Sequence, residues 1–477
     1  MKPGYIPREQ RKKILLMCDD IRTHSGIGTI AKEIVIHTAH CINWVNVGAA
    51  INHPDTGKRF DLSPDTNQLA GIDDTSVILY PSNGYGNPDM VRQLIDIEKP
   101  DTIFIITDPR YWTWLFQMEN EIRKKVPIIY LNIWDDYPAP MYNDAFYESC
   151  DLLMGISKQT VNINHLVLGE KVKDKMICYV PHGLNHEIFK PLDKDDEKLV
   201  EFKKNLYGDK KIEFAVLFNS RNIRRKQVPD TIWAYKMFVD KLSLEEAKKC
   251  ALVLHTQPVD ENGTDLPAVI DMLCGDDERY NIIFSNQRLD PHGMNLLYNS
   301  TDCQILLTSN EGWGLSLTEA ILVGNPIIAN VTGGMQDQMR FEDEKGLWIE
   351  FDDQFPSNHR GRYKKCGPWA FPVFPTSISI VGSVPTPYIF DDRCEPSDAA
   401  EQIYNVYKLN PDDRKARGLL GREWAIGEEA GFTSVHQANR IIANIEKLFS
   451  YWKPRKNYNV IKCDPIKKKV APHNLVY

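Results

Sequence analysis

A chain of 477 residues is too long to fold around one hydrophobic core, so we expect two α/β domains of about 200 residues each. Hydrophobic residues make up 42% of the chain and charged residues 26%, which is ordinary globular usage. The formal net charge of −8 argues against a general binder of polyanions, although one face of the protein could still be basic.

The cysteines and the N-terminal segment bear on the cellular compartment. The ten cysteines include no C-x-x-C pair, and several lie inside apolar runs, so we expect buried free thiols in a reducing compartment. The N-terminal segment MKPGYIPREQRKK is polar and lacks the apolar stretch of a signal peptide. No run of about eighteen apolar residues occurs. These features predict a soluble, cytoplasmic protein without integral membrane association.

The first half of the chain alternates apolar runs with helical stretches. The run KILLMC (13–18) is bounded by charge, which is typical of a strand buried on both faces of a parallel sheet. Further strands are expected at 44–48, 76–81, 102–108, 127–134, 151–157 and 176–181, and helices at 31–38, 90–98, 114–125 and 158–168. This alternation predicts a parallel sheet with helices on both faces, and ligands at the carboxyl ends of its strands.

A proline and a dense charge run indicate a linker at FKPLDKDDEK (189–198). This segment contains a D-x-D sequence at Asp193 and Asp195, which a metal-dependent transferase could use to hold a divalent cation. No strand precedes it, so we expect these carboxylates to lie on a solvated surface.

The second half of the chain repeats the alternation of strand and helix. Strands are expected at 212–220, 250–256, 280–286 and 303–309, and helices at 226–242, 265–275, 293–300, 315–324, 397–409, 412–426 and 434–452. The last of these helices has amphipathic spacing. The tail that begins at Lys453 is basic and interrupted by prolines. Two nucleotide-binding folds are therefore expected to face each other across a cleft.

The stretch TSNEGWGLSLTEAILVG (308–324) is the most informative about chemistry. Gly312 and Gly314 follow an expected strand, and a residue without Cβ lets the backbone approach a ligand closely. The helix that begins there has free backbone N–H groups in its first turn, which form a ready anion site. Glu311 and Glu319 lie on either side of this turn, although each alone could be an ordinary acid near a helix N-terminus.

The sequence EGWGLSLTE resembles the E-x7-E motif of retaining GT-B glycosyltransferases, a nucleotide-sugar-dependent family related to glycogen and sucrose synthases. Three more segments resemble family motifs in the family's order: the glycine loop HSGIGTIAKEI (24–34), the interdomain segment VPHGLNHEIFKP (180–191) and the Arg/Lys diphosphate segment FNSRNIRRKQ (218–227). The resemblance covers roughly residues 13–350 and 395–450. It implies the GT-B architecture: two Rossmann-like parallel-sheet domains that face each other, and a C-terminal helix that crosses back to the first.

On this basis we divide the chain into four parts. They are an N-terminal acceptor-side domain (1–190), a C-terminal nucleotide-sugar-binding domain (191–430), a crossover helix (431–452) and a basic tail (453–477). The family pattern breaks at 355–390, a stretch rich in proline, glycine and aromatic residues that we interpret as an inserted loop. Long loops in compact domains are uncommon and tend to be functional. The loop is either a packing flap or an acceptor-recognition element.

The resemblance assigns catalytic roles to three residues. Arg221 and Lys226 would neutralise the charge that grows on the leaving diphosphate, so neither a metal ion nor another cofactor is implied. The alternative is that RNIRRK forms a solvated basic loop. Glu311 would lie beside the donor sugar and stabilise the developing positive charge, whereas Glu319 would accept the two ribose hydroxyls of the donor.

Further donor contacts are expected from the backbone. N–H groups at Trp313, Gly314 and Leu315 would bind the remaining sugar hydroxyls. Gly26 and Gly28 would let the first domain's loop close on the diphosphate, although a helix-opening turn explains a G-x-G equally well.

One position departs from the family pattern. Family members often carry His-Asp after the fifth strand, with the histidine near the donor sugar, but this chain has Trp134 there. Asp135 or Asp108 could take the histidine's part, or the sugar geometry differs. The identity of the transferred sugar therefore stays open.

These features predict a retaining glycosyltransferase that moves a hexose or pentose from a UDP-, GDP- or ADP-sugar to a hydroxyl acceptor. A nucleotide-sugar epimerase of the same fold is an alternative. A non-catalytic binding protein is disfavoured, since Arg221, Lys226, Glu311 and Glu319 are all present. A glycan or small molecule is the favoured acceptor and a lipid-linked sugar ranks lower. The sequence HRGRYKK (359–365) and the basic tail leave a hydroxylated base in DNA open.

Overall fold

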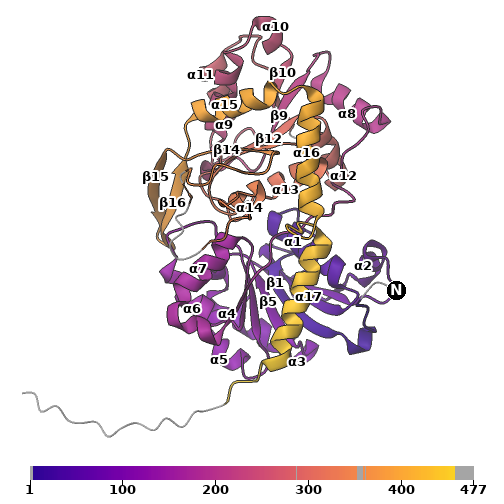
Figure 1. Ribbon diagram of the computed structural model, residues 1–477. Helices are drawn as coiled ribbons and strands as arrows, with labels where there is room; N and C mark the ends of the chain where they lie inside the picture. The colour runs from indigo at the N-terminus through magenta and orange to yellow at the C-terminus, as the bar shows by residue number, and fades with distance from the viewer. Residues whose placement is uncertain (1–3, 286, 352–357, 360, 457–477) are drawn as a thin grey trace, which may run out of the picture.

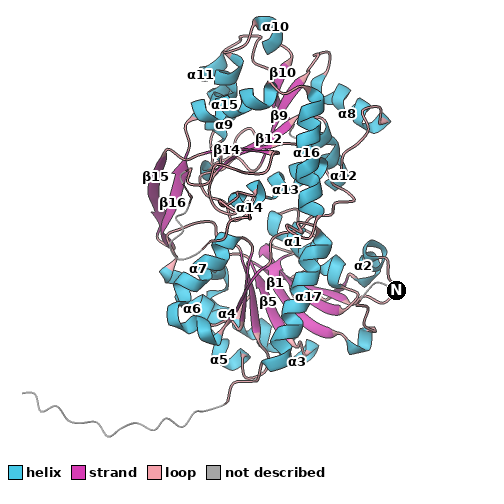
Figure 2. Cartoon of the chain, viewed as in Figure 1, coloured by secondary structure: helices cyan, strands magenta, loops and turns pink. Residues whose placement is uncertain are grey.

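The computed structural model describes residues 4–285, 287–351, 358–359 and 361–456, and Figure 1 shows two α/β units stacked end to end. Each unit has a central sheet with helices on both sides (Figure 2). The chain passes from the first unit to the second through residues 180–213. The two Rossmann-like, mostly parallel-sheet units expected from the sequence are confirmed.

The first sheet has eight strands in the order β3-β4-β2-β1-β5-β6-β7-β8. All neighbours are parallel except β3 and β4, which pair antiparallel. The strands are β1 (Lys12–Asp19), β2 (Ile42–Ile51), β3 (Phe60–Asp61), β4 (Val77–Asn83), β5 (Thr102–Ile106), β6 (Ile128–Asn132), β7 (Leu152–Gly155) and β8 (Met176–Tyr179). Consecutive residues Ile14 to Asp19 of β1 are all buried, as expected for a strand covered on both faces.

The helices of the first unit cover both faces of this sheet (Figure 2). They are α1 (Gly26–Thr38), α2 (Ser63–Ala70), α3 (Pro88–Glu98), α4 (Thr113–Gln117), α5 (Glu119–Ile122), α6 (Asp144–Glu148) and α7 (Lys158–Leu168). The single helix expected at 114–125 is wrong: it is broken at Met118, whose φ of −88° and ψ of 2° leave the helical region. Helix α1 begins before the expected start at 31, because the Ser25 side chain accepts a hydrogen bond from the Gly28 N–H and caps it.

The second sheet has six parallel strands in the order β11-β10-β9-β12-β13-β14. They are β9 (Phe214–Asn219), β10 (Cys250–His255), β11 (Ile282–Phe284), β12 (Cys303–Leu306), β13 (Ile327–Asn330) and β14 (Ala370–Val373). The strand order reverses between β9 and β12, as it does between β1 and β5 in the first sheet. Parallel α/β sheets bind ligands at such reversals, beyond the carboxyl ends of the strands.

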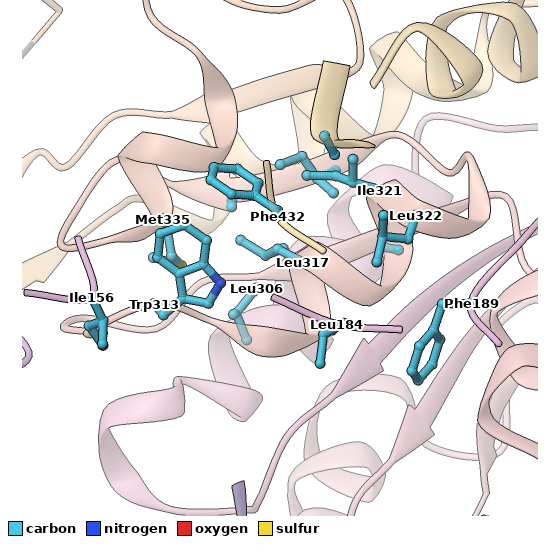
Figure 3. Close-up of a cluster of buried hydrophobic side chains, with 14 of the residues drawn as sticks. Ile156, Leu184, Phe189, Leu306, Trp313, Leu317, Ile321, Leu322, Met335 and Phe432 are labelled. Carbon is cyan, nitrogen blue, oxygen red and sulfur yellow. The ribbon is translucent and has the colours of Figure 1, made fainter. Parts of the chain in front are cut away.

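Helix α13 (Leu315–Val323) lies inside the second unit, where apolar side chains surround it. Figure 3 shows Leu317 and Ile321 of this helix with Leu306, Met335 and Phe432, all of which are buried. The other helices of this unit are α8 (Glu197–Tyr207), α9 (Val228–Val239), α10 (Leu244–Ala247), α11 (Leu266–Cys274), α12 (Pro291–Asn299), α14 (Met335–Met339), α15 (Pro396–Tyr407) and α16 (Pro411–Ile426). The apolar packing of α13 fixes the position of its N-terminus.

Helix α17 (Ser434–Tyr451) crosses back and lies along the first unit (Figure 1). Its first residue, Ser434, donates a hydrogen bond from Oγ to Glu33 Oε2 of α1 at 2.7 Å. Ile441, Ile445 and Leu448 are buried on its inner face. The expected crossover helix is therefore present. No helix in the described ranges is both long and apolar enough to cross a membrane.

The segment 355–390, which we interpreted as an inserted loop, contains regular secondary structure. It contains β14, the sixth strand of the second sheet, and most of a hairpin made of β15 (Ser377–Ser383) and β16 (Thr386–Arg393). Figure 1 shows this hairpin at one side of the second unit, with its lower end near helix α7 of the first unit. Residues 352–357 and 360, and 457–477 of the basic tail, lie outside the described residues.

Two smaller expectations concern exposed and buried side chains. Asp193 and Asp195 of the D-x-D sequence are exposed, as expected for a solvated surface. All nine cysteines in the described part of the chain are free thiols, seven of them buried and two half-buried, and Cys463 lies outside it.

Candidate active site

A cavity of about 930 Å³ lies between the two units, where the reversal points of their sheets face each other. Its volume is in the range of small-molecule sites, roughly 300–1,000 Å³. The first unit contributes residues 24–27 at the start of α1 and residues that follow β6, β7 and β8. The second unit contributes the segment at 219–226 after β9 and the segment at 311–316 that begins α13. The cavity thus combines segments that lie nearly 300 residues apart in the sequence.

The N-terminus of α13 opens into this cavity. Gly314 precedes the helix with φ of 87°, a left-handed conformation that a residue with Cβ adopts rarely. Trp313, Gly314 and Leu315 all line the cavity. Trp313 is only 2% exposed, because its Nε1–H donates to Thr318 Oγ1 at 2.9 Å and its ring packs against Phe432. Backbone N–H groups at the start of a helix lack partners within it, so this first turn could bind an anion.

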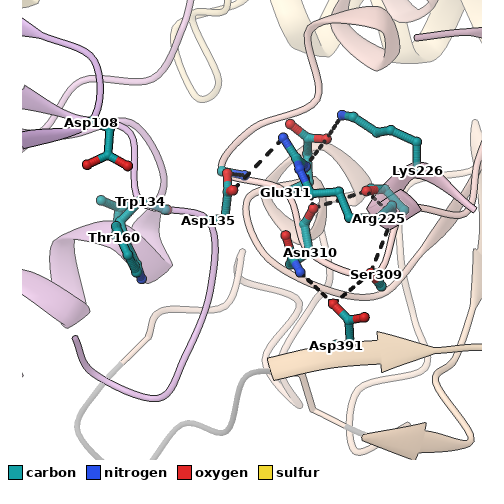
Figure 4. A network of polar contacts seen from close by, with 12 residues as sticks. Asp108, Trp134, Asp135, Thr160, Arg225, Lys226, Ser309, Asn310, Glu311 and Asp391 are labelled. Carbon is teal, nitrogen blue, oxygen red and sulfur yellow. Dashed lines mark hydrogen bonds and ion pairs between the residues drawn. The ribbon is translucent and has the colours of Figure 1, made fainter. Parts of the chain in front are cut away.

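Glu311 stands at the centre of a charge network (Figure 4). Its Oε2 accepts a hydrogen bond from Arg225 Nη1 at 3.1 Å and contacts Lys226 Nζ more closely. Burial alone would raise the pKa of Glu311, but Lys226 and Arg225 hold that pKa below its ordinary value. Burial lowers the pKa of Lys226, followed by repulsion from Arg225. Two cations are therefore assembled around one carboxylate at the cavity wall.

Arg221 is placed differently from Lys226. Its side chain lines the edge of the cavity but is 61% exposed, and its Nε donates to Asp260 Oδ2 at 2.8 Å. The structure therefore brings Arg225, and not Arg221, beside Glu311. Sequence reasoning missed Arg225, although its position next to Lys226 in RNIRRK could have indicated it.

Glu319 lies at another part of the same cavity. Its Oε2 accepts hydrogen bonds from Tyr298 Oη at 2.6 Å and from Asn219 Nδ2 at 3.3 Å. Burial raises the pKa of Glu319 to about 7, more than these two hydrogen bonds lower it. The group is therefore close to half-ionised at neutral pH when the cavity is empty.

The two glycines of the first domain's loop have separate environments. Gly26 lines the cavity, and a Cβ there would come within 3.7 Å of Leu315 Cδ1 on the opposite unit. Gly28 lies outside the cavity lining. A Cβ at Gly28 would collide with Thr23, because the helix start packs tightly on the preceding turn.

Asp135 joins the two units, whereas Asp108 does not. Asp135 Oδ1 accepts a hydrogen bond from the Gly312 N–H at 2.9 Å, and its Oδ2 lies 3.9 Å from Arg225 Nη2. Asp108 accepts from Arg110 Nε at 2.7 Å and lines a neighbouring cavity instead. Trp134 is buried, and its Nε1–H donates to the Asp136 carbonyl at 2.8 Å. Asp135 is thus the acidic residue of this pair that borders the main cavity.

His182 is a cavity residue that sequence reasoning missed. It follows β8, lies 6.3 Å from the Trp313 ring between centroids, and its Nδ1 is 3.4 Å from Gln437 Nε2 of α17. Burial lowers its pKa to about 3, so the imidazole is neutral at pH 7. Its position in VPHGLNHEIFKP, the segment that resembles the family's interdomain motif, could have indicated it.

Within 4–285, 287–351, 358–359 and 361–456, no group of three or more His, Cys, Asp or Glu side chains is arranged to hold a metal ion. The positive charge at the cavity comes from arginine, lysine and a helix N-terminus.

Comparisons with known proteins concern one part of the sequence and the fold. Residues 279–355 match the sequence model of the family described as glycosyl transferases group 1. This stretch includes β12, Glu311, the glycine turn and α13. No curated protein matches the chain in sequence.

Solved structures resemble the whole fold. HepE of Anabaena, solved in complex with UDP and glucose, is 12% identical, with a TM-score of 0.61 over 92% of this chain and 100% of that one. Sucrose-phosphate synthase of Thermosynechococcus elongatus is 14% identical, with a TM-score of 0.63 over 92% and 100%. A trehalose 6-phosphate synthase of Burkholderia multivorans is 10% identical, with a TM-score of 0.61 over 92% and 99%. At these identities the likeness concerns the fold.

Proposed function

We propose that this glycosyltransferase, which has the GT-B fold and matches glycosyl transferases group 1 over residues 279–355, moves a sugar from a nucleoside-diphosphate sugar to an acceptor hydroxyl with retention at the anomeric carbon. The observation that carries the proposal is the convergence of cations and a helix N-terminus on one cavity. HepE, which shares the fold, was solved with UDP and glucose, so a UDP-sugar is the first donor to test.

The diphosphate of the donor would lie between Lys226, Arg221 and the first turn of α13. As the bond between C1 and the phosphate oxygen breaks, negative charge grows on the diphosphate, and preorganised donors stabilise that charge without reorganising. A buried ammonium such as Lys226 interacts strongly with an anion, because little water screens it. The arrangement suits a leaving group that stays anionic.

The two glutamates would bind opposite ends of the donor. Glu319 can accept both ribose hydroxyls as charge-assisted hydrogen bonds. Glu311 would lie near the sugar, where positive charge develops as the C1–O bond breaks. The acceptor oxygen then bonds to C1 on the face that the diphosphate leaves, and its proton passes to the departing phosphate oxygen.

The test is a screen of UDP-, GDP- and ADP-sugars for binding by calorimetry and for slow hydrolysis without acceptor. At least one donor is expected to bind with a Kd below about 1 mM and to be hydrolysed. EDTA is expected to leave hydrolysis unchanged. Failure of every nucleotide to bind would contradict the proposal, as would binding without turnover under any acceptor. Isomerisation of the donor would identify an epimerase instead.

Glu311→Gln is expected to lower kcat by about 10²-fold or more with nearly unchanged donor Kd. The substitution removes the negative charge that would stabilise the sugar cation, while the side chains of Lys226 and Arg225, which pair with Glu311, stay in place at the cavity. Turnover and calorimetric Kd are measured together. Glu428→Gln, whose side chain is 97% exposed, is the matched control. Lost donor binding with normal kcat would mean that the role of Glu311 is wrong.

A further inference from the structure

A second cavity, of about 560 Å³, adjoins the donor cavity. The two cavities meet at Ile133, Asp135, Ile223 and Arg225, which line both of them. A molecule in the second cavity would therefore lie beside the proposed donor sugar, next to the Asp135–Arg225 pair that borders Glu311. Its volume is also in the range of small-molecule sites, roughly 300–1,000 Å³.

The β15–β16 hairpin forms the opposite wall of this second cavity and contributes Ser383, Thr386 and Asp391. Several contacts tie the hairpin to the first unit, among them three hydrogen bonds to its backbone carbonyl groups or from its backbone N–H. Arg110 Nη1 donates to the Pro385 carbonyl at 2.8 Å, Tyr142 Oη donates to the Tyr388 carbonyl at 2.9 Å, and the Phe390 N–H donates to the Tyr137 carbonyl at 2.7 Å. The hairpin thus bridges the units and encloses the cavity.

Asp391 is held rigidly in this wall (Figure 4). Its Oδ1 accepts hydrogen bonds from Ser309 Oγ at 2.9 Å and from Asn310 Nδ2 at 2.7 Å. Its Oδ2 makes no hydrogen bond to any residue that the structure describes. Asp391 can therefore accept a hydrogen bond from a ligand without giving up its own contacts.

The charges that line the second cavity cancel. It has three carboxylates and three guanidinium groups, together with hydroxyl, amide and indole groups. The charged residues are Asp108, Asp135, Asp391, Arg110, Arg224 and Arg225. Such a mixture of fixed donors and acceptors beside an aromatic ring suits a neutral ligand with many hydroxyls. A phosphate backbone would instead require an excess of cations.

We propose that this second cavity is the acceptor site and that the acceptor is a free carbohydrate of one or two sugar rings, whose hydroxyls the hairpin recognises through Asp391. This inference rests on the proposed function and adds the acceptor class and the element that selects it. The hairpin begins in the segment where the family resemblance of the sequence breaks.

The test uses the donor found in the screen with two kinds of acceptor. One is a panel of free mono- and disaccharides, and the other is a DNA duplex containing 5-hydroxymethylcytosine. We expect transfer to at least one free sugar and none to the duplex. Asp391→Asn should raise the sugar's KM by about tenfold or more while donor KM stays within about twofold, because one charged acceptor is lost.

Two further variants make the test specific. Ser379→Ala, on the residue paired with Asp391 in the hairpin but outside the cavity lining, should leave both KM values unchanged. Ser383→Ala, a milder change in the lining, should raise the sugar's KM by about threefold. This variant replaces Asp391→Asn in the test if Asp391→Asn does not fold. Acceptor-free hydrolysis of the donor, measured in each variant, reports the donor site separately.

The outcomes separate the two proposals. If no nucleotide-sugar is bound or turned over, the proposed function is wrong and this inference is wrong with it. If the donor is turned over but no free sugar is an acceptor, or if Asp391→Asn leaves the sugar's KM unchanged, the acceptor assignment alone is overturned. Transfer to the duplex alone would identify a DNA-modifying enzyme.

Discussion

Lys226→Ala is expected to lower donor turnover by about 10²- to 10³-fold, the usual cost of removing one preorganised charge stabiliser. The Lys226 ammonium is buried against Glu311 at the wall of the donor cavity. Its removal leaves the diphosphate with one cation fewer in a site that little water enters. Steady-state kcat and KM, with acceptor-free hydrolysis as a second readout, measure the effect.

Arg221→Ala extends this test to an exposed cation. Arg221 has to leave Asp260 to bind the diphosphate. We expect Arg221→Ala to lower turnover by about 10²-fold. Lys125→Ala, on an exposed lysine paired with Asp96, is the control and should be neutral. Full turnover in both the Lys226 and Arg221 variants would remove the diphosphate assignment.

The sequence predicted the elements of the sheets well, because buried parallel strands are short apolar runs that helices separate. The run at 13–18 became β1, and α13 ends at Gly324, whose φ of 87° terminates it as expected. The order in which the strands pair could not be predicted from these runs, because neighbouring strands such as β9 and β12 lie far apart in the chain. Only the family resemblance implied it.

The hairpin escaped prediction for a local reason. Gly382 lies in β15, Pro385 at the turn and Pro387 in β16. Proline and glycine usually argue against a strand. A two-stranded hairpin tolerates them, because each strand pairs along one edge only. The alternation in SISIVGS (377–383) was the signal available.

The site was predicted in part. Glu311, Glu319 and Lys226 do line one cavity, because they lie in the segments that follow β9 and β12 at the carboxyl edge of the second sheet. Arg225, His182 and Asp391 were missed as cavity residues. Their roles depend on partners distant in sequence: His182, for example, contacts a residue of the crossover helix 255 positions away. Local pattern carries no information about such contacts.

Glu319→Gln is expected to stabilise the empty protein at high pH while weakening donor binding. Folding raises the pKa of Glu319 from its ordinary 4.5 to about 7 through burial, so the folded protein favours the neutral acid. Such a group contributes stability below its unfolded pKa, and this contribution is lost as pH rises through the folded pKa. At pH 8 the buried carboxylate therefore costs on the order of 3 kcal/mol.

Glutamine removes that cost because it cannot ionise. Its Oε1 can still accept the hydrogen bonds from Tyr298 and Asn219, which both reach a single oxygen of Glu319. The free energies of unfolding of wild type and variant should thus be similar at pH 5, and the variant should be more stable by about 2–3 kcal/mol at pH 8. Urea titrations at both pH values measure this, with Glu428→Gln as the control. Equal stabilities at pH 8 would contradict the buried, ionisable state.

Donor binding should become tighter as the pH rises, whereas the contribution of Glu319 to stability falls. The ribose hydroxyls donate to the carboxylate, so binding favours the ionised form, and the wild-type affinity for the donor should rise as pH increases from 6 to 8. Glu319→Gln should raise donor Kd about tenfold at pH 8, abolish this pH dependence, and change kcat less, because the ribose lies away from the breaking bond. Calorimetry with an intact nucleotide-sugar tests this. A wild-type affinity that is flat across pH 6–8 would place the ribose elsewhere and leave Glu319 as a structural acid whose ionisation opposes folding.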